Sequence, residues 1–336
     1  MSKEKGKKKE AKKSKLQVAF YWAASCGGCE IAVLDIDEKI LDVIGLVDIL
    51  FWPVAMDFKY KDVEAMKDNH IDVCFFNGSI RTEEQEHIAK LLRKKSKTMV
   101  AFGACAVNGG IPGLANVADR KDVFHTAYIE NPSTDNPKKI VPKTSVKVKE
   151  GTLTLPEFYD TVKTLDQTID VDYYLPGCPP TPDLIMTAVA AIAEGKLPPK
   201  GSTIGPLKSV CDECKFEKSE KRIKEIKRIY EVDKIEDKCL LEQGIICLGP
   251  ATRGSCEARC LDANMPCTGC GGPTPNSLDQ GAKMISALAS VLGIDGEEKM
   301  SDVEVEKLIE QVVDPIGTFY KYGLPNALIN RRVMKK

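Results

Sequence analysis

Cysteine is the residue type in this sequence with the greatest capacity for chemistry. The chain of 336 residues holds 13 cysteines but only three histidines. Cysteines at short spacings form disulfides, hold zinc or hold iron–sulfur clusters. The N-terminus is charged, has no apolar run and no twin arginine, which predicts a cytoplasmic chain. Thiols stay reduced in that compartment, so metal ligation is favoured over disulfides.

Four cysteines are predicted to meet at one edge of a parallel sheet. Cys26 and Cys29 form a C-x2-C pair after the first expected strand, and Cys105 and Cys178 follow the fourth and fifth. The carboxyl ends of the strands share one edge in such a sheet, and ligands bind there. One close pair with two single cysteines is a weaker zinc pattern than two close pairs. An iron–sulfur cluster is therefore favoured, with zinc as the alternative.

Eight further cysteines lie between residues 211 and 270, enough for two more sets of four. The bacterial ferredoxin run is absent, and spacing alone leaves both a mixed division and zinc open. Cys74 lies within an expected strand and is interpreted as a buried free thiol. No nucleophile–base pair or nucleotide loop is found, which favours electron transfer. By sequence order the sets are Cys211, Cys214, Cys239, Cys247 and then Cys256, Cys260, Cys267, Cys270.

Apolar patterning predicts the elements that position these residues. From 16 to 200, runs suited to buried strands alternate with segments suited to helices, which predicts a doubly wound parallel α/β sheet. Residues 107–170 interrupt this alternation as a long surface excursion with one hairpin at 145–154. The expected strands are 18–24, 47–54, 71–76, 98–104 and 172–175, and the expected helices are 30–44, 57–69, 82–95 and 182–194. The helix at 82–95 opens with a capping-box pattern at Thr82, and the helix at 182–194 is expected to end at Gly195.

Three regions are predicted along the chain. Residues 1–15 hold eight Lys and two Glu and form a flexible basic tail, residues 16–200 form the sheet domain, and residues 201–336 form an irregular, mostly helical domain. Helices are expected there at 217–230, 278–292 and 303–312. A segment so rich in Cys and Gly is not expected to build a large core, so its order should depend on metal. Outside the tail the chain is acidic, and no apolar run reaches 18 residues. We therefore expect neither nucleic acid nor a membrane as partner.

Several motifs resemble the small subunit of NiFe hydrogenases. They are Cys26-Gly-Gly-Cys29-Glu30, Gly103-Ala-Cys105, Pro176-Gly-Cys178-Pro-Pro180 and the C-terminal cysteine run. The resemblance covers about residues 16–280 and is closest to the archaeal methyl-viologen-reducing (deazaflavin-non-reducing) type. It implies a flavodoxin-like domain followed by an iron–sulfur domain. It also implies that hydrogen is split at the NiFe site of a large-subunit partner, while this chain conducts the electrons.

The same resemblance implies three 4Fe-4S clusters. The proximal cluster would take Cys26, Cys29, Cys105 and Cys178, the medial cluster Cys256, Cys260, Cys267 and Cys270, and the distal cluster Cys211, Cys214, Cys239 and Cys247. Periplasmic members of the family have His in the place of Cys211, and their medial cluster has only three Cys. The thiolate of Cys211 should lower the distal potential, and Cys260 supplies a fourth medial thiolate.

The partners implied beyond the large subunit are a 2Fe-2S adaptor subunit and a heterodisulfide reductase. Two other functions stay open: a deazaflavin-reducing hydrogenase small subunit, and a quinone- or ferredoxin-linked oxidoreductase subunit. Glu30 either assists proton transfer near the partner site or is a first-turn carboxylate favoured by the helix dipole.

Overall fold

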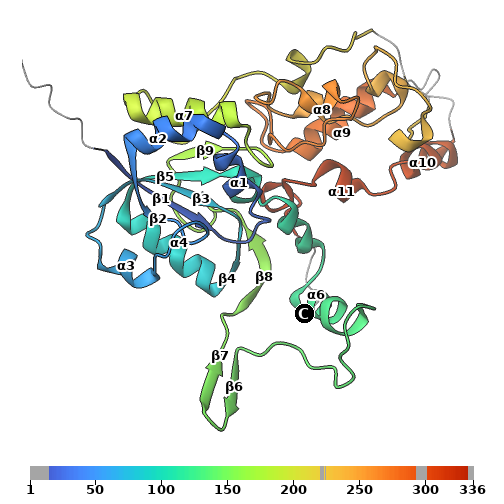
Figure 1. Ribbon diagram of the computed structural model, residues 1–336. Coiled ribbons are helices and arrows are strands. Elements are labelled where there is room, and N and C mark those ends of the chain that lie inside the picture. The colour runs from blue at the N-terminus through green and yellow to red at the C-terminus, as the bar shows by residue number, and fades with distance from the viewer. Residues whose placement is uncertain (1–14, 220–222, 224, 293–300, 332–336) are drawn as a thin grey trace, which may run out of the picture.

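A six-stranded parallel sheet forms the centre of the N-terminal part of the molecule (Figure 1). The computed structural model describes residues 15–219, 223, 225–292 and 301–331. The strand order is β10-β9-β5-β3-β1-β2, and apart from the unpredicted two-residue β10 this is the order of flavodoxin-like sheets. The predicted fold class is therefore confirmed. The strands are β1 (Leu16–Trp22), β2 (Val47–Phe51), β3 (Ile71–Asn77), β5 (Ser96–Phe102), β9 (Tyr173–Leu175) and β10 (Ser202–Thr203).

Each face of the sheet has its own hydrophobic core, because successive side chains of a strand point to opposite sides. In β1, Val18 and Phe20 lie in one core and Ala19 and Tyr21 in the other. Helices cover both faces, so the sheet is doubly wound (Figure 1). The first core is covered by α1 (Gly28–Leu34), α2 (Ile40–Leu46) and α7 (Pro182–Glu194), and the second by α3 (Tyr60–Ala65), α4 (Glu83–Lys95) and α5 (Gly103–Asn108).

Local signals explain where several helices begin and end. The hydroxyl of Thr82 accepts a hydrogen bond from the Gln85 N–H, and the Gln85 side chain accepts one from the Thr82 N–H, so α4 starts at its predicted capping box. Helix α7 has its predicted bounds and ends at Gly195, whose φ is 68°. The single helix predicted at 30–44 is wrong. The chain breaks there into α1 and α2, because Asp37 adopts a left-handed φ of 54°.

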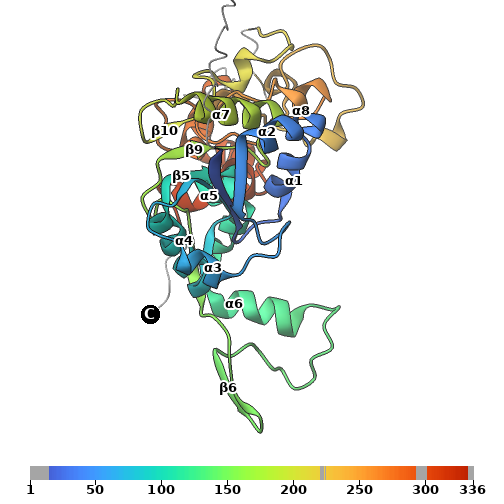
Figure 2. The same cartoon turned by 60° about the vertical axis from the view of Figure 1, so that its left-hand side comes forward.

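The excursion at 107–170 contains more structure than predicted. Its hairpin forms as expected, from β6 (Ser145–Val148) and β7 (Gly151–Thr154), and every residue of both strands is exposed. It also contains α6 (Arg120–His125) and β8 (Phe158–Lys163), which pairs with β4 (Ile80–Thr82). Figure 2 shows α6 and the hairpin projecting away from the sheet.

The C-terminal region has a hydrophobic core of its own, which its cysteine-rich stretch did not predict. Its large apolar side chains come both from that stretch, such as Phe216 and Leu240, and from beyond it, such as Met284 in α9 and Phe319 in α11. The cysteines contribute as well, since Cys247 and Cys267 are buried members of this core. Its helices are α8 (Arg259–Asp262), α9 (Gln280–Val291), α10 (Asp302–Glu310) and α11 (Pro315–Phe319).

The helix predicted at 217–230 is wrong. Within the described part of this stretch, only a short 3-10 turn beginning at Ile229 is helical. The backbone N–H groups are committed elsewhere: those of Glu217, Ile223 and Lys227 donate to the carbonyl oxygens of Asp237, Val291 and Gly244. Long-range pairing has therefore overridden a local pattern of charged and apolar residues.

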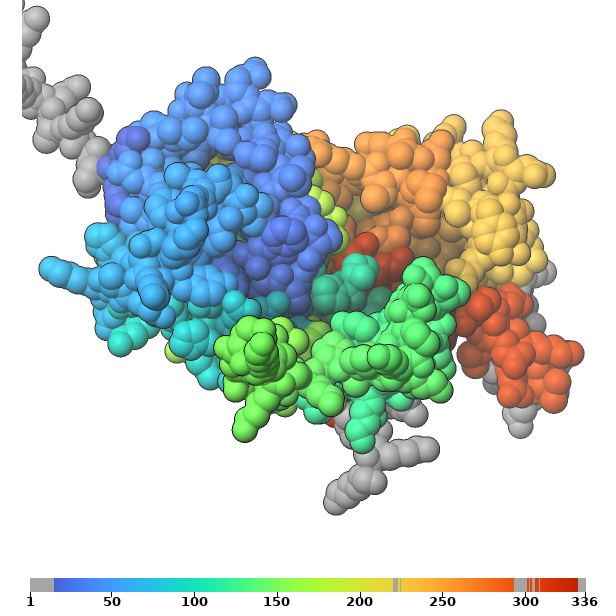
Figure 3. All heavy atoms as spheres, turned by 60° about the horizontal axis from the view of Figure 1, so that its bottom comes forward, coloured from blue at the N-terminus to red at the C-terminus, as the bar shows by residue number. Residues whose placement is uncertain are grey.

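The segment around Tyr322–Pro325 packs back against both ends of the excursion. The Gly110 N–H donates to the Tyr322 carbonyl at 3.0 Å, and the Gln167 side chain donates to the Pro325 carbonyl at 2.8 Å. The sheet domain and the C-terminal region thus lie side by side as two lobes (Figure 3). None of the described helices combines the length and the apolar character that a membrane span needs.

Candidate functional site

The first four cysteines meet at the carboxyl edge of the sheet, as predicted. Cys26 follows β1, Cys29 lies in α1, Cys105 lies in α5 directly after β5, and Cys178 follows β9. Burial raises the pKa of the Cys29 thiol, and the thiols of Cys105, Cys178 and Cys26 raise it further. Burial raises the pKa of Cys105 to about 12, with Cys178 and Cys26 adding to the shift. Burial also raises the pKa of Cys178, and Cys26 adds to that shift. Every pair among the four thiols therefore interacts.

Glycine makes this close approach possible. Gly103 has a φ of 85°, and a Cβ atom built on it would lie 2.2 Å from the Cys29 sulfur. Any side chain at this position would therefore displace Cys29. The loops after β5 and β9 are also joined directly, since the Ala104 N–H donates to the Gly177 carbonyl at 2.7 Å. The backbone thus holds two of the cysteine-bearing loops together.

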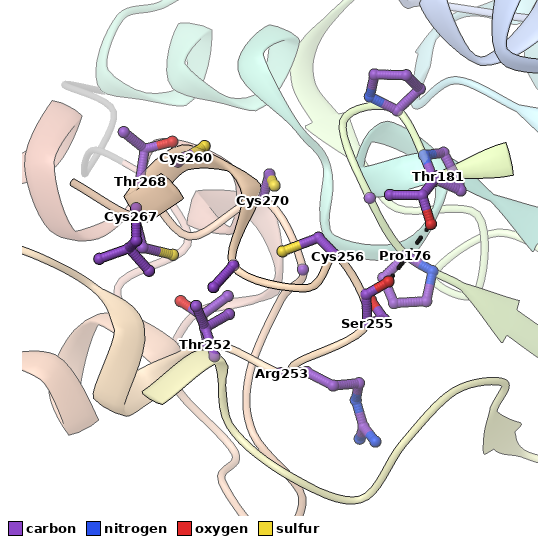
Figure 4. Close-up of a pocket in the computed structure, with 17 residues that line it drawn as sticks. Pro176, Thr181, Thr252, Arg253, Ser255, Cys256, Cys260, Cys267, Thr268 and Cys270 are labelled. Atoms are coloured by element: carbon purple, nitrogen blue, oxygen red, sulfur yellow. Dashed lines mark hydrogen bonds between the residues drawn. The ribbon is translucent and has the colours of Figure 1, made fainter. Parts of the chain in front are cut away.

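The cysteines between 256 and 270 form another group, beside the first. All four line one cavity, together with Pro176, Gly177 and Pro179 from the loop that carries Cys178 (Figure 4). Burial raises the pKa of Cys270 to about 11, and the thiols of Cys256, Cys178 and Cys260 add to the shift. Cys270 thereby contacts both its own group and the first one.

The remaining four cysteines form a group on the other side of this cavity. Burial raises the pKa of Cys211 to about 12, with contributions from the thiols of Cys247, Cys239 and Cys214, while Lys218 opposes the shift. Burial also raises the pKa of Cys267, and Cys247 is the first of the thiols that add to it. The Cys267 N–H donates to the Cys247 sulfur at 3.3 Å. The 256–270 group therefore lies between the other two.

The donor sets fit iron–sulfur clusters. Each group supplies thiol sulfurs, and backbone N–H groups point at several of them: Gly249 and Cys267 toward Cys247, and Ala258 and Arg259 toward Cys256. Hydrogen bonds to the sulfurs are among the features that set the properties of such clusters. Gly249 also leaves space beside two of the sulfurs, because a Cβ atom there would lie 3.0 Å from the Cys211 sulfur and 3.6 Å from the Cys247 sulfur. Within the described part of the chain, no three Cys, His, Asp or Glu side chains are arranged to hold a single metal ion.

Cys74 and the histidines lie apart from these groups. Cys74 is fully buried in the core beneath α4, as expected, and burial raises its pKa to about 12. His125 lies in the excursion, where its Nδ1 is 3.2 Å from the Glu130 carboxylate.

Glu30 lies beside the first group, with partners that sequence inspection missed. Its side chain is buried, its carboxylate accepts a hydrogen bond from the Trp52 indole N–H, and the Asn77 amide donates to it at 3.4 Å. Burial raises the pKa of Glu30, and the two donors oppose that shift. Trp52 and Asn77 lie at the carboxyl ends of β2 and β3, the two neighbours of β1. The strand order of a flavodoxin-like sheet, the fold that the resemblance implied, was the signal that could have found them.

Comparison with known proteins gives close relatives over nearly the whole chain. The iron-sulfur subunit of the F420-non-reducing hydrogenase from Archaeoglobus profundus is 45% identical, over 95% of this chain and 99% of that protein. The corresponding F420-non-reducing hydrogenase chain of Methanothermobacter thermautotrophicus is 40% identical, over 96% and 98%. The family model for the NADH ubiquinone oxidoreductase 20 kDa subunit matches residues 26–192.

Solved structures with a similar chain path include the NiFeSe hydrogenase from Desulfovibrio vulgaris Hildenborough. The TM-score is 0.48 at 17% identity, and the match covers 79% of this chain and 95% of that one. The full-length relatives confirm the resemblance seen in the cysteine motifs. The chain therefore belongs to the family of F420-non-reducing hydrogenase iron-sulfur subunits, and so to the small subunits of NiFe hydrogenases.

Proposed function

We propose that this chain carries electrons from hydrogen oxidised on its large-subunit partner through three 4Fe-4S clusters toward an outer acceptor. The observation that carries the proposal is the position of the 256–270 group. Cys178 of the first group adds to the upward shift in the pKa of Cys270. Cys247 of the last group adds to the upward shift in the pKa of Cys267. Clusters at these three places would supply one-electron carriers in series.

These contacts support a ligand set for each cluster. Cys26, Cys29, Cys105 and Cys178 would hold the proximal cluster, the four cysteines at 256–270 the medial cluster, and Cys211, Cys214, Cys239 and Cys247 the distal cluster. The domain division at about residue 200 belongs to the same proposal. Two hydrophobic cores pack on the sheet, and the third is built only from residues beyond 209.

The acceptor that we propose is a 2Fe-2S adaptor subunit linked to a heterodisulfide reductase, in the cytoplasm. The names of the relatives support an acceptor other than the deazaflavin F420, since they are called F420-non-reducing. A quinone-linked subunit is the second candidate, favoured by the family model. That model ends at residue 192, before the eight C-terminal cysteines, and so it favours the shared sheet domain rather than the complete chain.

Iron and acid-labile sulfide analysis of the purified chain, with EPR after dithionite reduction, tests the cluster number. We expect about twelve of each per chain, as three cubane clusters require. A count near four would contradict the proposal, and zinc without visible absorbance would replace it.

The Cys214→Ala variant tests the order of the clusters. If Cys214 serves the outermost cluster, the variant complex should still exchange hydrogen isotopes on the large subunit and should fail to reduce its acceptor. Cys105→Ala is the matched variant at the other end, and it should lose both activities. Loss of isotope exchange in a correctly assembled Cys214→Ala complex would contradict the order.

Glu30 is the residue that we propose for proton transfer near the partner subunit. Its carboxylate is buried, and the Trp52 and Asn77 donors fix its position. Glu30→Gln keeps the shape but removes the proton-accepting group, so isotope exchange should slow at unchanged iron content. Unchanged exchange would leave Glu30 as a structural carboxylate.

A further inference from the structure

A buried carboxylate lies at the seam between the last two cysteine groups. The chain around Lys208–Glu213 runs beside Thr252–Gly254, since the Val210 N–H donates to the Thr252 carbonyl at 2.9 Å and the Gly254 N–H donates to the Lys208 carbonyl at 2.8 Å. Glu213 precedes Cys214 in the chain, and the seam also brings it near Cys256. Its carboxylate therefore lies between cysteines of two different groups.

This carboxylate is poorly neutralised. The Glu213 side chain is 7% exposed, and its nearest cation is the Lys208 Nζ, 3.4 Å from Oε1. The other oxygen, Oε2, is buried without a hydrogen-bond partner among the described residues. The neighbouring Gly254 leaves room for the group, because a Cβ atom there would lie 2.7 Å from Oε1. The negative charge of the Glu213 carboxylate is thus buried and only partly neutralised by Lys208.

The carboxylate lies beside the chain that leads into the 256–270 group. Its Oε1 is next to Gly254, which is two residues before Cys256. Water screens a buried charge much less than an exposed one. A carboxylate at this place disfavours the additional electron of a reduced cluster beside it, because net charge helps to set cluster potentials.

We propose that the Glu213 carboxylate is a fixed negative charge that lowers the reduction potential of the cluster held by Cys256, Cys260, Cys267 and Cys270. Lys208 is its partial counter-charge, and its side chain is 48% exposed, so it neutralises the carboxylate incompletely. This inference rests on the proposed function.

EPR-monitored redox titration of the complete hydrogenase complex tests the proposal. Glu213→Gln keeps the side-chain shape and removes the charge, so the midpoint potential of one cluster should rise. Lys208→Met removes the counter-charge, so the same potential should fall. Glu257→Gln is the matched control, because Glu257 adjoins Cys256 in the chain but is exposed. It should shift the potential much less.

The outcomes separate this inference from the proposed function. If the wild type lacks three 4Fe-4S signals, the proposed function fails, and this inference fails with it. If the wild type has all three and Glu213→Gln shifts no potential beyond the Glu257→Gln control, only the role of Glu213 is overturned. If Glu213→Gln loses iron, Lys208→Met decides: a lowered potential supports the proposal, and an unchanged one overturns it.

Discussion

The cysteine group at the sheet edge and the two groups beyond it are held in place by different means. The first group hangs from loops at the ends of β1, β5 and β9, which are strands of one continuous sheet. The other two lie on irregular chain whose order comes from single long-range backbone contacts, such as the Ser209–Arg253 and Lys227–Ile245 bridges. Both regions bury cysteines in a core, Cys29 in the first and Cys247 and Cys267 in the second, but only the first region is built by continuous strand pairing. The two regions should therefore respond differently to loss of iron.

Of the changes considered, removal of iron should have the largest effect on structure, and this effect should be confined to the C-terminal region. In the chelated, reduced chain, amide hydrogens of residues 209–275 should exchange rapidly, because binding free energy is folding free energy at such sites. Amides of β3 and β5 should keep their protection. Hydrogen-exchange mass spectrometry of the loaded and stripped chain measures this. Equal loss of protection in both regions would remove the distinction.

Gly103→Ala should damage the first group alone. The new Cβ atom would meet the Cys29 sulfur, and the φ of 85° is unfavourable for alanine. We expect the iron content to fall by about one cluster's share, with the C-terminal clusters retained. Gly45→Ala is the control, since nothing lies within 4 Å of its Cβ position. It should leave iron unchanged and stability equal or higher by about 0.5–1 kcal/mol.

Asp172→Asn should weaken the strands that carry Cys105 and Cys178. The Asp172 carboxylate pairs with Arg93 and Lys200, both at 2.6 Å, and accepts from the Met99 N–H at 2.8 Å. Burial pushes its pKa upward, but these partners outweigh burial and lower it. A depressed folded-state pKa gives stability that is present above the unfolded value of about 3.9 and lost as the pH falls through the folded value. The variant should lose about 1–3 kcal/mol at pH 7 and show a flatter acid limb in denaturant unfolding. An unchanged acid limb would contradict this.

Thr82→Ala should produce the smallest change. It removes the side-chain acceptor at the start of α4 and should cost about 1 kcal/mol, while Thr82→Ser should restore most of it. The iron content should not change, because α4 carries no cysteine. A loss of iron in Thr82→Ala would show that the cysteine group at the sheet edge depends on helix α4 as well as on strand pairing.

Sequence inspection succeeded where the determinants are local. The capping box at Thr82, the terminal glycine at Gly195 and the hairpin at 145–154 each depend on a few adjacent residues. The meeting of Cys26, Cys29, Cys105 and Cys178 is long-range, yet a general rule about parallel sheets places it.

Sequence inspection failed where hydrogen bonds between distant parts of the chain determine the local structure. No local pattern at 217–230 reveals that its N–H groups are taken by distant residues. Ile223 donates to the Val291 carbonyl, and Ile226 donates to the Gln311 side chain. Likewise, no spacing places Glu213 against Cys256, because the seam that joins them has no sequence signature. The strand order of the sheet points to the partners of Glu30, because they lie at the ends of the two strands next to β1. No sequence motif points to them.

The contact between Tyr322 and the sheet edge has a consequence for biosynthesis. Gly110 lies against Cys105, since a Cβ atom on Gly110 would lie only 2.4 Å from that sulfur, and its N–H is bonded to the carbonyl of Tyr322. A ribosome must therefore translate the chain at least as far as Tyr322 before the loop next to Cys105 can reach its final packing. Until then, the surroundings of this thiol stay incomplete.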